Sequence, residues 1–218
     1  MKLLKVFFFT ILYCVFNGLV WIWFAFAPEE LYYTNVIYGY DFINSSIFLF
    51  VLTIIFTVCK RKDVLEFHKT KPKFYILAIF LGIGFVFFQA FLNLIYHFKL
   101  SYLFVDYNFS LSDLQSFNAL AYTCIIPITE ELFFRNYIQR ELTQKYHPYL
   151  AITLASLLFA FIHLQIIIYL FHYPFIDWHH AYITLFGGLI SGVLLYKSKS
   201  IVPSILFHIC WNITVSVV

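Results

Sequence analysis

The sequence has little charge and few cysteines, and both shortages exclude whole classes of protein. Charged residues make up 11% of the 218 residues, whereas 62% are hydrophobic. Soluble domains carry about 25% charged residues, so neither a soluble globule nor a disordered chain fits. The four cysteines (Cys14, Cys59, Cys124 and Cys210) show no CxxC spacing. They therefore indicate neither a disulfide framework nor a zinc cluster. The chain also lacks internal repeats and low-complexity tracts.

The formal net charge of +3 does not indicate a nucleic-acid partner. The basic residues lie between long apolar runs and do not gather on one polar face, as a nucleic-acid interface requires. We therefore expect no nucleic acid among the partners of this protein.

Long apolar runs dominate the chain instead. A helix needs about 20 apolar residues to cross a bilayer, and seven segments approach that length. The sequence therefore predicts an all-α, polytopic membrane helix bundle with about seven transmembrane helices. The sixth segment is the shortest and is rich in glycine, which would let a neighbouring helix approach closely. The segments are Val6–Ala27, Phe42–Cys59, Phe74–Phe98, Phe117–Phe134, Tyr149–Phe171, Ala181–Tyr196 and Ile201–Val218.

The basic residues predict the orientation of these spans. If the N-terminus is inside, every Lys and Arg except Lys99 falls on an inner segment, as the positive-inside rule demands. Trp21, Trp23 and Trp178 then lie near the outer boundary. The first span is too long for a usual signal peptide, although Ala25-Phe26-Ala27 resembles a cleavage site. We therefore expect it to be a helix of the bundle.

Ionisable residues inside the spans need a physical reason, because each costs roughly 2.5–3.5 kcal/mol on insertion scales. Glu131 and Arg135 are four residues apart, so they share a helix face and are expected to neutralise each other. Glu130 has Phe134 at its i+4 position and must find its partner on another helix. Pro127, three residues earlier, tends to kink the helix beside this acid.

Two later spans carry the other polar residues. His163 lies in the fifth span, and His208 and Asn212 share one face of the seventh. Each could merely join helices through hydrogen bonds. Together with Glu130, however, they could form one polar cavity, which we expect in the inner half of the membrane. A carboxylate and a histidine can activate water, and a histidine with an amide can stabilise an oxyanion. These are the groups that amide hydrolysis requires.

The three motifs together resemble those of the CAAX protease and bacteriocin-processing (CPBP, or Abi) family. This family of intramembrane endopeptidases includes the eukaryotic type II CAAX prenyl endopeptidase. The resemblance covers roughly residues 115–218 as the protease core, and residues 1–114 show only compatible N-terminal transmembrane helices. We expect both parts to form one structural domain. The motifs are Glu130-Glu131-x-x-x-Arg135, Phe159-x-x-x-His163 and His208-x-x-x-Asn212.

The resemblance implies a role for each matching residue. Glu130 would be the general base that activates water, and His163 would help to hold that water. His208 and Asn212 would stabilise the tetrahedral oxyanion.

The resemblance also makes Glu131 and Arg135 supporting residues of the site. No cofactor is expected. A divalent metal such as zinc stays open as an alternative, with Glu130, His163 and His208 as its ligands. We favour hydrolysis by the glutamate without a metal.

The expected substrate is a membrane-associated or lipidated protein or peptide, cleaved within the lipid bilayer. The abundance of Phe, Ile, Tyr, Asn and Lys favours an AT-rich bacterial genome, and thus a bacterial cytoplasmic membrane. Two other classes remain open. One is a non-catalytic immunity or scaffold protein of the bacteriocin self-immunity type. The other is a proton-coupled transporter, because buried Glu and His also serve proton relays.

Overall fold

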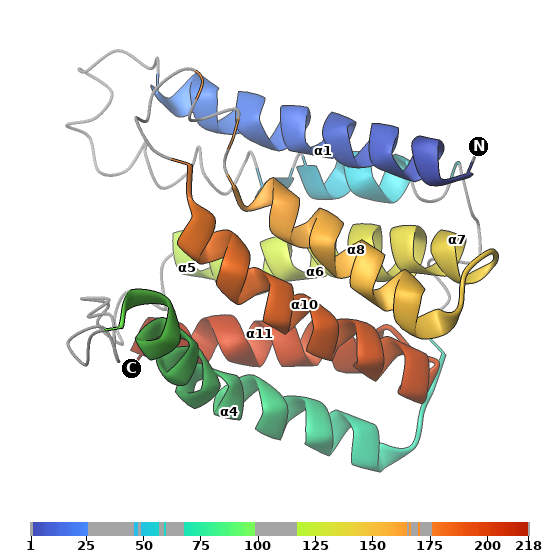
Figure 1. Ribbon diagram of the computed structural model, residues 1–218, viewed down its shortest axis with the longest axis vertical. Coiled ribbons are helices and arrows are strands. Elements are labelled where there is room, and N and C mark those ends of the chain that lie inside the picture. Colours follow the sequence, from blue (N-terminus) through green and yellow to red (C-terminus); the bar gives the residue numbers. More distant parts are fainter. Residues whose placement is uncertain are drawn as a thin grey trace.

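The computed structural model describes residues 2–25, 46–47, 49–56, 59, 68–98, 117–164, 166, 170 and 176–217. The described residues form helices and short connections, without a strand among them. Figure 1 shows these helices side by side, with the polypeptide running back and forth along one direction. The expectation of an all-α fold is confirmed for this part of the chain.

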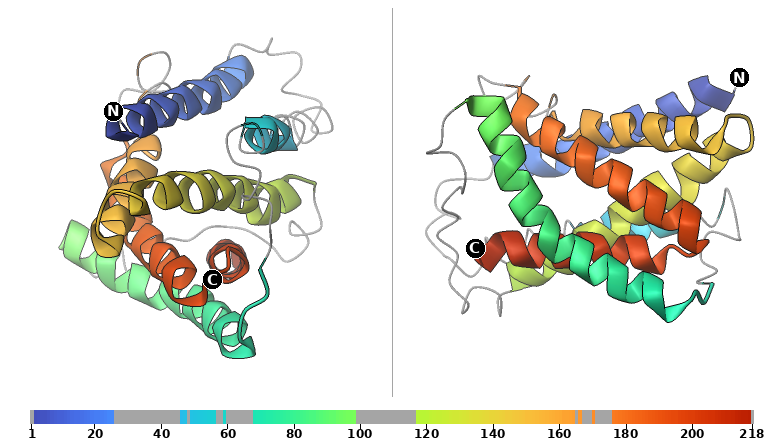
Figure 2. Two further views of the ribbon diagram at one scale, coloured as in Figure 1. Left: turned by 90° about the vertical axis from the view of Figure 1, so that its right-hand side faces the viewer. Right: turned by 60° about the horizontal axis from the view of Figure 1, so that its bottom comes forward.

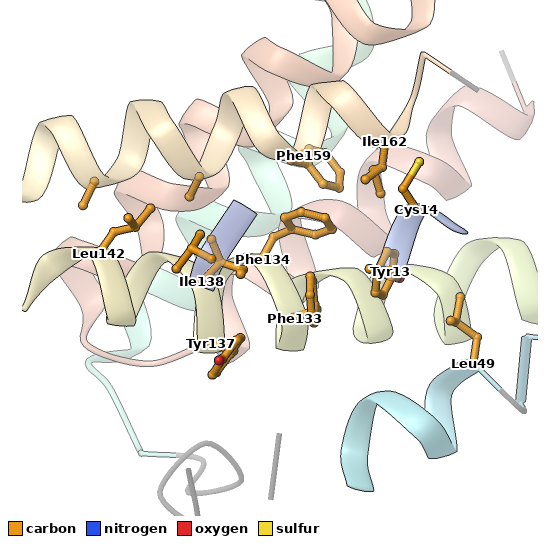
Figure 3. Packing of buried hydrophobic residues seen from close by; sticks show 13 residues of the cluster. Tyr13, Cys14, Leu49, Phe133, Phe134, Tyr137, Ile138, Leu142, Phe159 and Ile162 are labelled. Carbon is orange, nitrogen blue, oxygen red and sulfur yellow. The ribbon is translucent and has the colours of Figure 1, made fainter. Parts of the chain in front are cut away.

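The N-terminal helix α1 (Lys2–Ala25) lies along α8 (Pro148–Ile162) at one side of the bundle. Its buried residues join those of α8 and of the helical residues 49–56 in one hydrophobic core. Figure 3 shows this core from close by. Helix α1 is therefore part of the packed structure, as expected for a helix of the bundle. Its buried residues in this core are Val6, Tyr13 and Cys14.

A second core joins three helices on the other side of the bundle. Helix α4 (Pro72–His97) packs along α11 (Val202–Val217), and α10 (Trp178–Ser198) crosses both (Figure 2). Phe85 and Trp211 meet edge to face here, with ring centroids 4.6 Å apart. This core ties α4, from the N-terminal part of the chain, to the C-terminal helices.

A long helix with two π-helical segments runs between the two cores. It consists of α5 (Phe117–Leu120), η4 (Ala121–Ile125), α6 (Ile126–Glu130), η5 (Glu131–Gln139) and α7 (Arg140–Thr143). π-Helical turns are rare in proteins overall, but those that occur often lie at functional sites. Pro127 lies two residues beyond the end of the first π segment, so the chain departs from α geometry close to where the proline was expected to disturb it.

The outer surface of the bundle is strongly apolar. On α4, Phe80 is 69% exposed and Phe87 is 61% exposed, and several leucines and isoleucines beside them are exposed too. A surface of this kind needs lipid or protein to cover it. Two described helices, α4 and α10, are long and apolar enough to cross a membrane. The number of spans and the orientation of the N-terminus stay predictions.

Two of the expected spans end elsewhere in the structure. The fourth continues past Phe134 to Thr143, because its next polar residues are buried against other helices and do not emerge at a surface. Arg135, which we expected on an inner segment, is fully buried. The fifth ends earlier, where α8 stops at Ile162 and His163 caps it. Much of the second span, Phe42–Cys59, lies outside the described residues.

Candidate active site

Glu130 lies where α6 ends and η5 begins, in the middle of the long helix, and its side chain is 5% exposed. Two histidines from other helices face its carboxylate. His163 Nε2 lies 3.7 Å from Oε1, and His208 Nε2 lies 3.8 Å from Oε2. Both distances exceed a direct hydrogen bond. The structure thus brings three expected site residues together, and Glu130 has its partners on other helices.

The His163 ring is fixed by the end of α8. Its Nδ1 lies 2.8 Å from the carbonyl oxygen of Phe159. Because a carbonyl only accepts, Nδ1–H is the donor, and Nε2 of the neutral ring carries a free lone pair. The Phe159 ring lies against the imidazole, with centroids 4.5 Å apart. His163 therefore presents an acceptor to Glu130.

Glu131 is surrounded much more tightly than Glu130. Its Oε2 accepts a short hydrogen bond from Ser191 Oγ on α10 and lies 3.6 Å from Arg135 Nε. Its Oε1 lies 3.2 Å from His208 Nδ1 on α11. The expected pairing of Glu131 with Arg135 is present, but Glu131 also anchors His208. This carboxylate therefore joins three helices.

Arg135 is fully buried between η5, α8 and α10. Its Nε donates to Ser191 Oγ at 3.3 Å, and its guanidinium lies over the Phe159 ring at 5.0 Å. A Cβ atom at Gly188 would come within 2.9 Å of Nη2. The glycines of α10 thus permit the close approach expected from the sequence, and the neighbour that Gly188 admits is this buried cation.

Asn212 lies one helical turn beyond His208 on α11. Its Nδ2 donates to the backbone carbonyl of Tyr122 in η4, at 3.0 Å. An amide nitrogen has two hydrogens, so one remains for another acceptor. The catalytic roles of Asn212 and of the other expected residues stay predictions.

Sequence reasoning missed two polar neighbours of the site. Ser191 lies among the glycines of the sixth predicted span, and its position within that small-residue stretch was the available signal. His180, at the start of α10, packs edge-on against His163, with ring centroids 4.8 Å apart. It is held by Asp177, whose Oδ1 accepts from the His180 backbone N–H at 2.9 Å. Their distance in sequence from the motifs concealed both residues.

The arrangement also bears on the alternative of a metal centre. Among the residues that the structure describes, no group of three His, Cys, Asp or Glu side chains is placed to hold a metal ion. Glu130, His163 and His208 are the residues that would hold a metal, and that alternative stays a prediction.

A carboxylate facing two histidines inside an apolar helical bundle defines a site suited to hydrolysis within a membrane. Comparison with known families agrees. Residues 112–214 match the family described as type II CAAX prenyl endopeptidase Rce1-like. The match covers slightly less than half of the chain and supports membership of this CAAX protease family. The matched range holds all six expected site residues. No curated protein and no solved structure matches the chain.

Proposed function

We propose that this protein is an intramembrane endopeptidase that hydrolyses a peptide bond with a water activated by Glu130. The observation that carries the proposal is the placement of a buried carboxylate between two histidine Nε2 atoms, at 3.7 and 3.8 Å. The family match to residues 112–214 supports the reaction class.

Glu130 and His163 are suited to hold the attacking water together. The carboxylate accepts one hydrogen of the water, and the lone pair on His163 Nε2 accepts the other. The lone pairs of the water oxygen then face the scissile carbonyl. Glu130 takes the proton as the water oxygen bonds to the carbonyl carbon. It returns that proton to the leaving amine as the C–N bond breaks.

His208 and Asn212 are suited to stabilise the oxyanion. His208 Nδ1 donates to Glu131, so a neutral His208 ring has no hydrogen left on Nε2. The ring therefore has to carry both protons when it donates to the oxyanion, and the Glu131 carboxylate balances its charge. With Arg135 protonated as well, two cations then face two carboxylates. Such a balance lowers the cost of burying each charge.

The apolar surface of the bundle makes a membrane-associated or lipidated protein or peptide the proposed substrate. Exposed aromatic and aliphatic side chains cover α4 and α1, so a substrate that partitions into lipid would reach the bundle from its sides.

The test is a cleavage assay on purified protein in lipid vesicles, with a lipidated peptide and its unlipidated counterpart. We expect cleavage of the lipidated peptide, with the rate unchanged after exhaustive chelation. Reversible loss on chelation would show that Glu130, His163 and His208 act as metal ligands. Binding of the peptide without any cleavage would favour a scaffold or immunity protein.

We further propose that the chain is a multi-pass protein of the bacterial cytoplasmic membrane with its N-terminus inside. The described lysines near the helix ends support this. Lys5, Lys73, Lys145 and Lys197 lie near the ends of α1, α4, α7 and α10 that meet at one end of the bundle (Figure 1).

Cys59 is exposed and offers a direct test of this orientation. An impermeant thiol reagent should label it in inverted vesicles but not in intact cells. Labelling in intact cells would reverse the orientation.

A further inference from the structure

Tyr13, on helix α1, has a buried hydroxyl that no described residue satisfies. The residue is 6% exposed, and among the described residues no group forms a hydrogen bond with its Oη. An unsatisfied buried polar group costs roughly 1–3 kcal/mol. Phenylalanine would fill the same space without that cost. Such a hydroxyl therefore calls for a partner from outside the described residues.

The surroundings of Tyr13 place it beside the candidate active site. Its ring stacks on Phe133 with centroids 4.5 Å apart and meets Phe134 edge-on at 5.5 Å. These two residues follow the glutamate pair directly in η5. Tyr13 therefore packs against the turn of η5 that directly follows Glu130 and Glu131.

The same aromatic packing fixes the direction of the Tyr13 ring. Figure 3 shows it beside the long helix and Phe133, in the cluster that also holds Ile162, the residue that precedes His163. A side chain held by two neighbouring rings can place a hydroxyl without further loss of rotamer entropy. The position is therefore suited to a directed hydrogen bond.

We propose that Tyr13 is a further catalytic residue, whose hydroxyl donates a hydrogen bond to a backbone carbonyl of the substrate beside the scissile bond. The inference rests on the proposed endopeptidase function. A peptide in extended form offers carbonyl oxygens that need donors once they leave water. Tyr13 would satisfy one of them and hold the peptide against Glu130. Helix α1 would then supply part of an active site that the family match, over residues 112–214, does not include.

The test is the substitution Tyr13→Phe, which keeps the ring and removes only the oxygen. We expect kcat/KM to fall about tenfold, which is the size of one neutral hydrogen bond. Thermal stability should stay the same or rise, because the variant buries no unsatisfied hydroxyl. A purely structural role cannot give loss of activity together with a gain in stability.

Tyr137→Phe is the matched control. Tyr137 is buried in the same cluster, but its ring faces Phe56, with centroids 5.2 Å apart. The control should cleave like the wild type. Wild-type kcat/KM in Tyr13→Phe, or an equal loss in both variants, would overturn the inference while leaving the endopeptidase intact. If the wild type cleaves nothing, or if Glu130→Gln cleaves as well as the wild type, the proposed function fails and this inference fails with it.

Discussion

Glu130 and Glu131 are neighbours in the chain, and both are buried, but their carboxylates have opposite surroundings. Glu131 is bonded to Ser191 and His208 and paired with Arg135, with contacts from three helices. Glu130 faces its two histidines across gaps longer than a hydrogen bond. A fully bonded carboxylate stabilises a fold, whereas a loosely bonded one can still accept a proton. The comparison teaches that one helix can place a structural acid and a reactive acid on adjacent residues.

The largest effect should come from Glu130→Gln. The amide keeps the shape of the side chain but cannot take a proton from water, so we expect kcat/KM to fall by about 10³-fold. The purified variant should melt at or above the wild-type temperature, because it buries one charge less. The cleavage rate and the melting temperature, measured on the same preparation, check both expectations. If this variant cleaved as fast as the wild type, Glu130 would not be the reactive acid.

Glu131→Gln should have its main effect on stability. It leaves Arg135 as a buried cation without its anion, which costs about 3–5 kcal/mol in comparable buried pairs. Unfolding in detergent, followed by denaturant titration, measures this loss. The double variant Glu131→Gln with Arg135→Leu is the control and should recover part of it. A loss of stability below about 1 kcal/mol would mean that the Glu131–Arg135 pair contributes no more than a solvent-exposed salt bridge.

Gly188→Ala should disturb Arg135, the partner of Glu131, from the neighbouring helix α10. The new Cβ would lie 2.9 Å from Arg135 Nη2 and 3.2 Å from Ser156 Cβ. Overpacking of this kind costs about 1–3 kcal/mol. We expect a lower melting temperature, with kcat/KM falling less than in Glu130→Gln. An unchanged melting temperature would show that the guanidinium can move aside freely.

Gly84→Ala is the matched control, and its effect should be the smallest. Gly84 lies inside α4, and a Cβ there would meet nothing within 4 Å. Alanine restricts the unfolded chain, so we expect a gain of about 0.5–1 kcal/mol. If this variant lost as much stability as Gly188→Ala, the tight packing around Gly188 would not explain the loss.

Much of this arrangement could be predicted from the sequence. The i, i+4 spacing of Glu131 and Arg135 predicted their pairing, and the lack of a basic partner for Glu130 predicted contacts with other helices. His163 and His208 supply those contacts. Helical periodicity is local, so it reveals which residues share a face and which acid lacks a partner.

The remaining features depend on distant parts of the chain. Ser191 and His180 are separated from the motifs in sequence and enter the site only through the packing of α10. The extension of the fourth span to Thr143 was missed, because its polar residues suggested a surface when they are in fact buried against glycines. Local hydropathy cannot distinguish a polar residue in water from one that is satisfied by a neighbouring helix.

The π-helical segment η5 has a consequence for how the chain tolerates insertions and deletions. A π turn closes its hydrogen bond one residue later than an α turn, so it holds one more residue in a wider turn. Removing one residue from η5 would restore an α-helix, and the residues beyond the deletion would keep nearly the same face relative to Glu130. The same deletion in a regular α-helix would turn every later residue by about 100°. Gln139, whose Nε2 donates to the Gly192 carbonyl at 2.9 Å, should therefore keep its partner after a deletion within η5 but lose it after a deletion within α6.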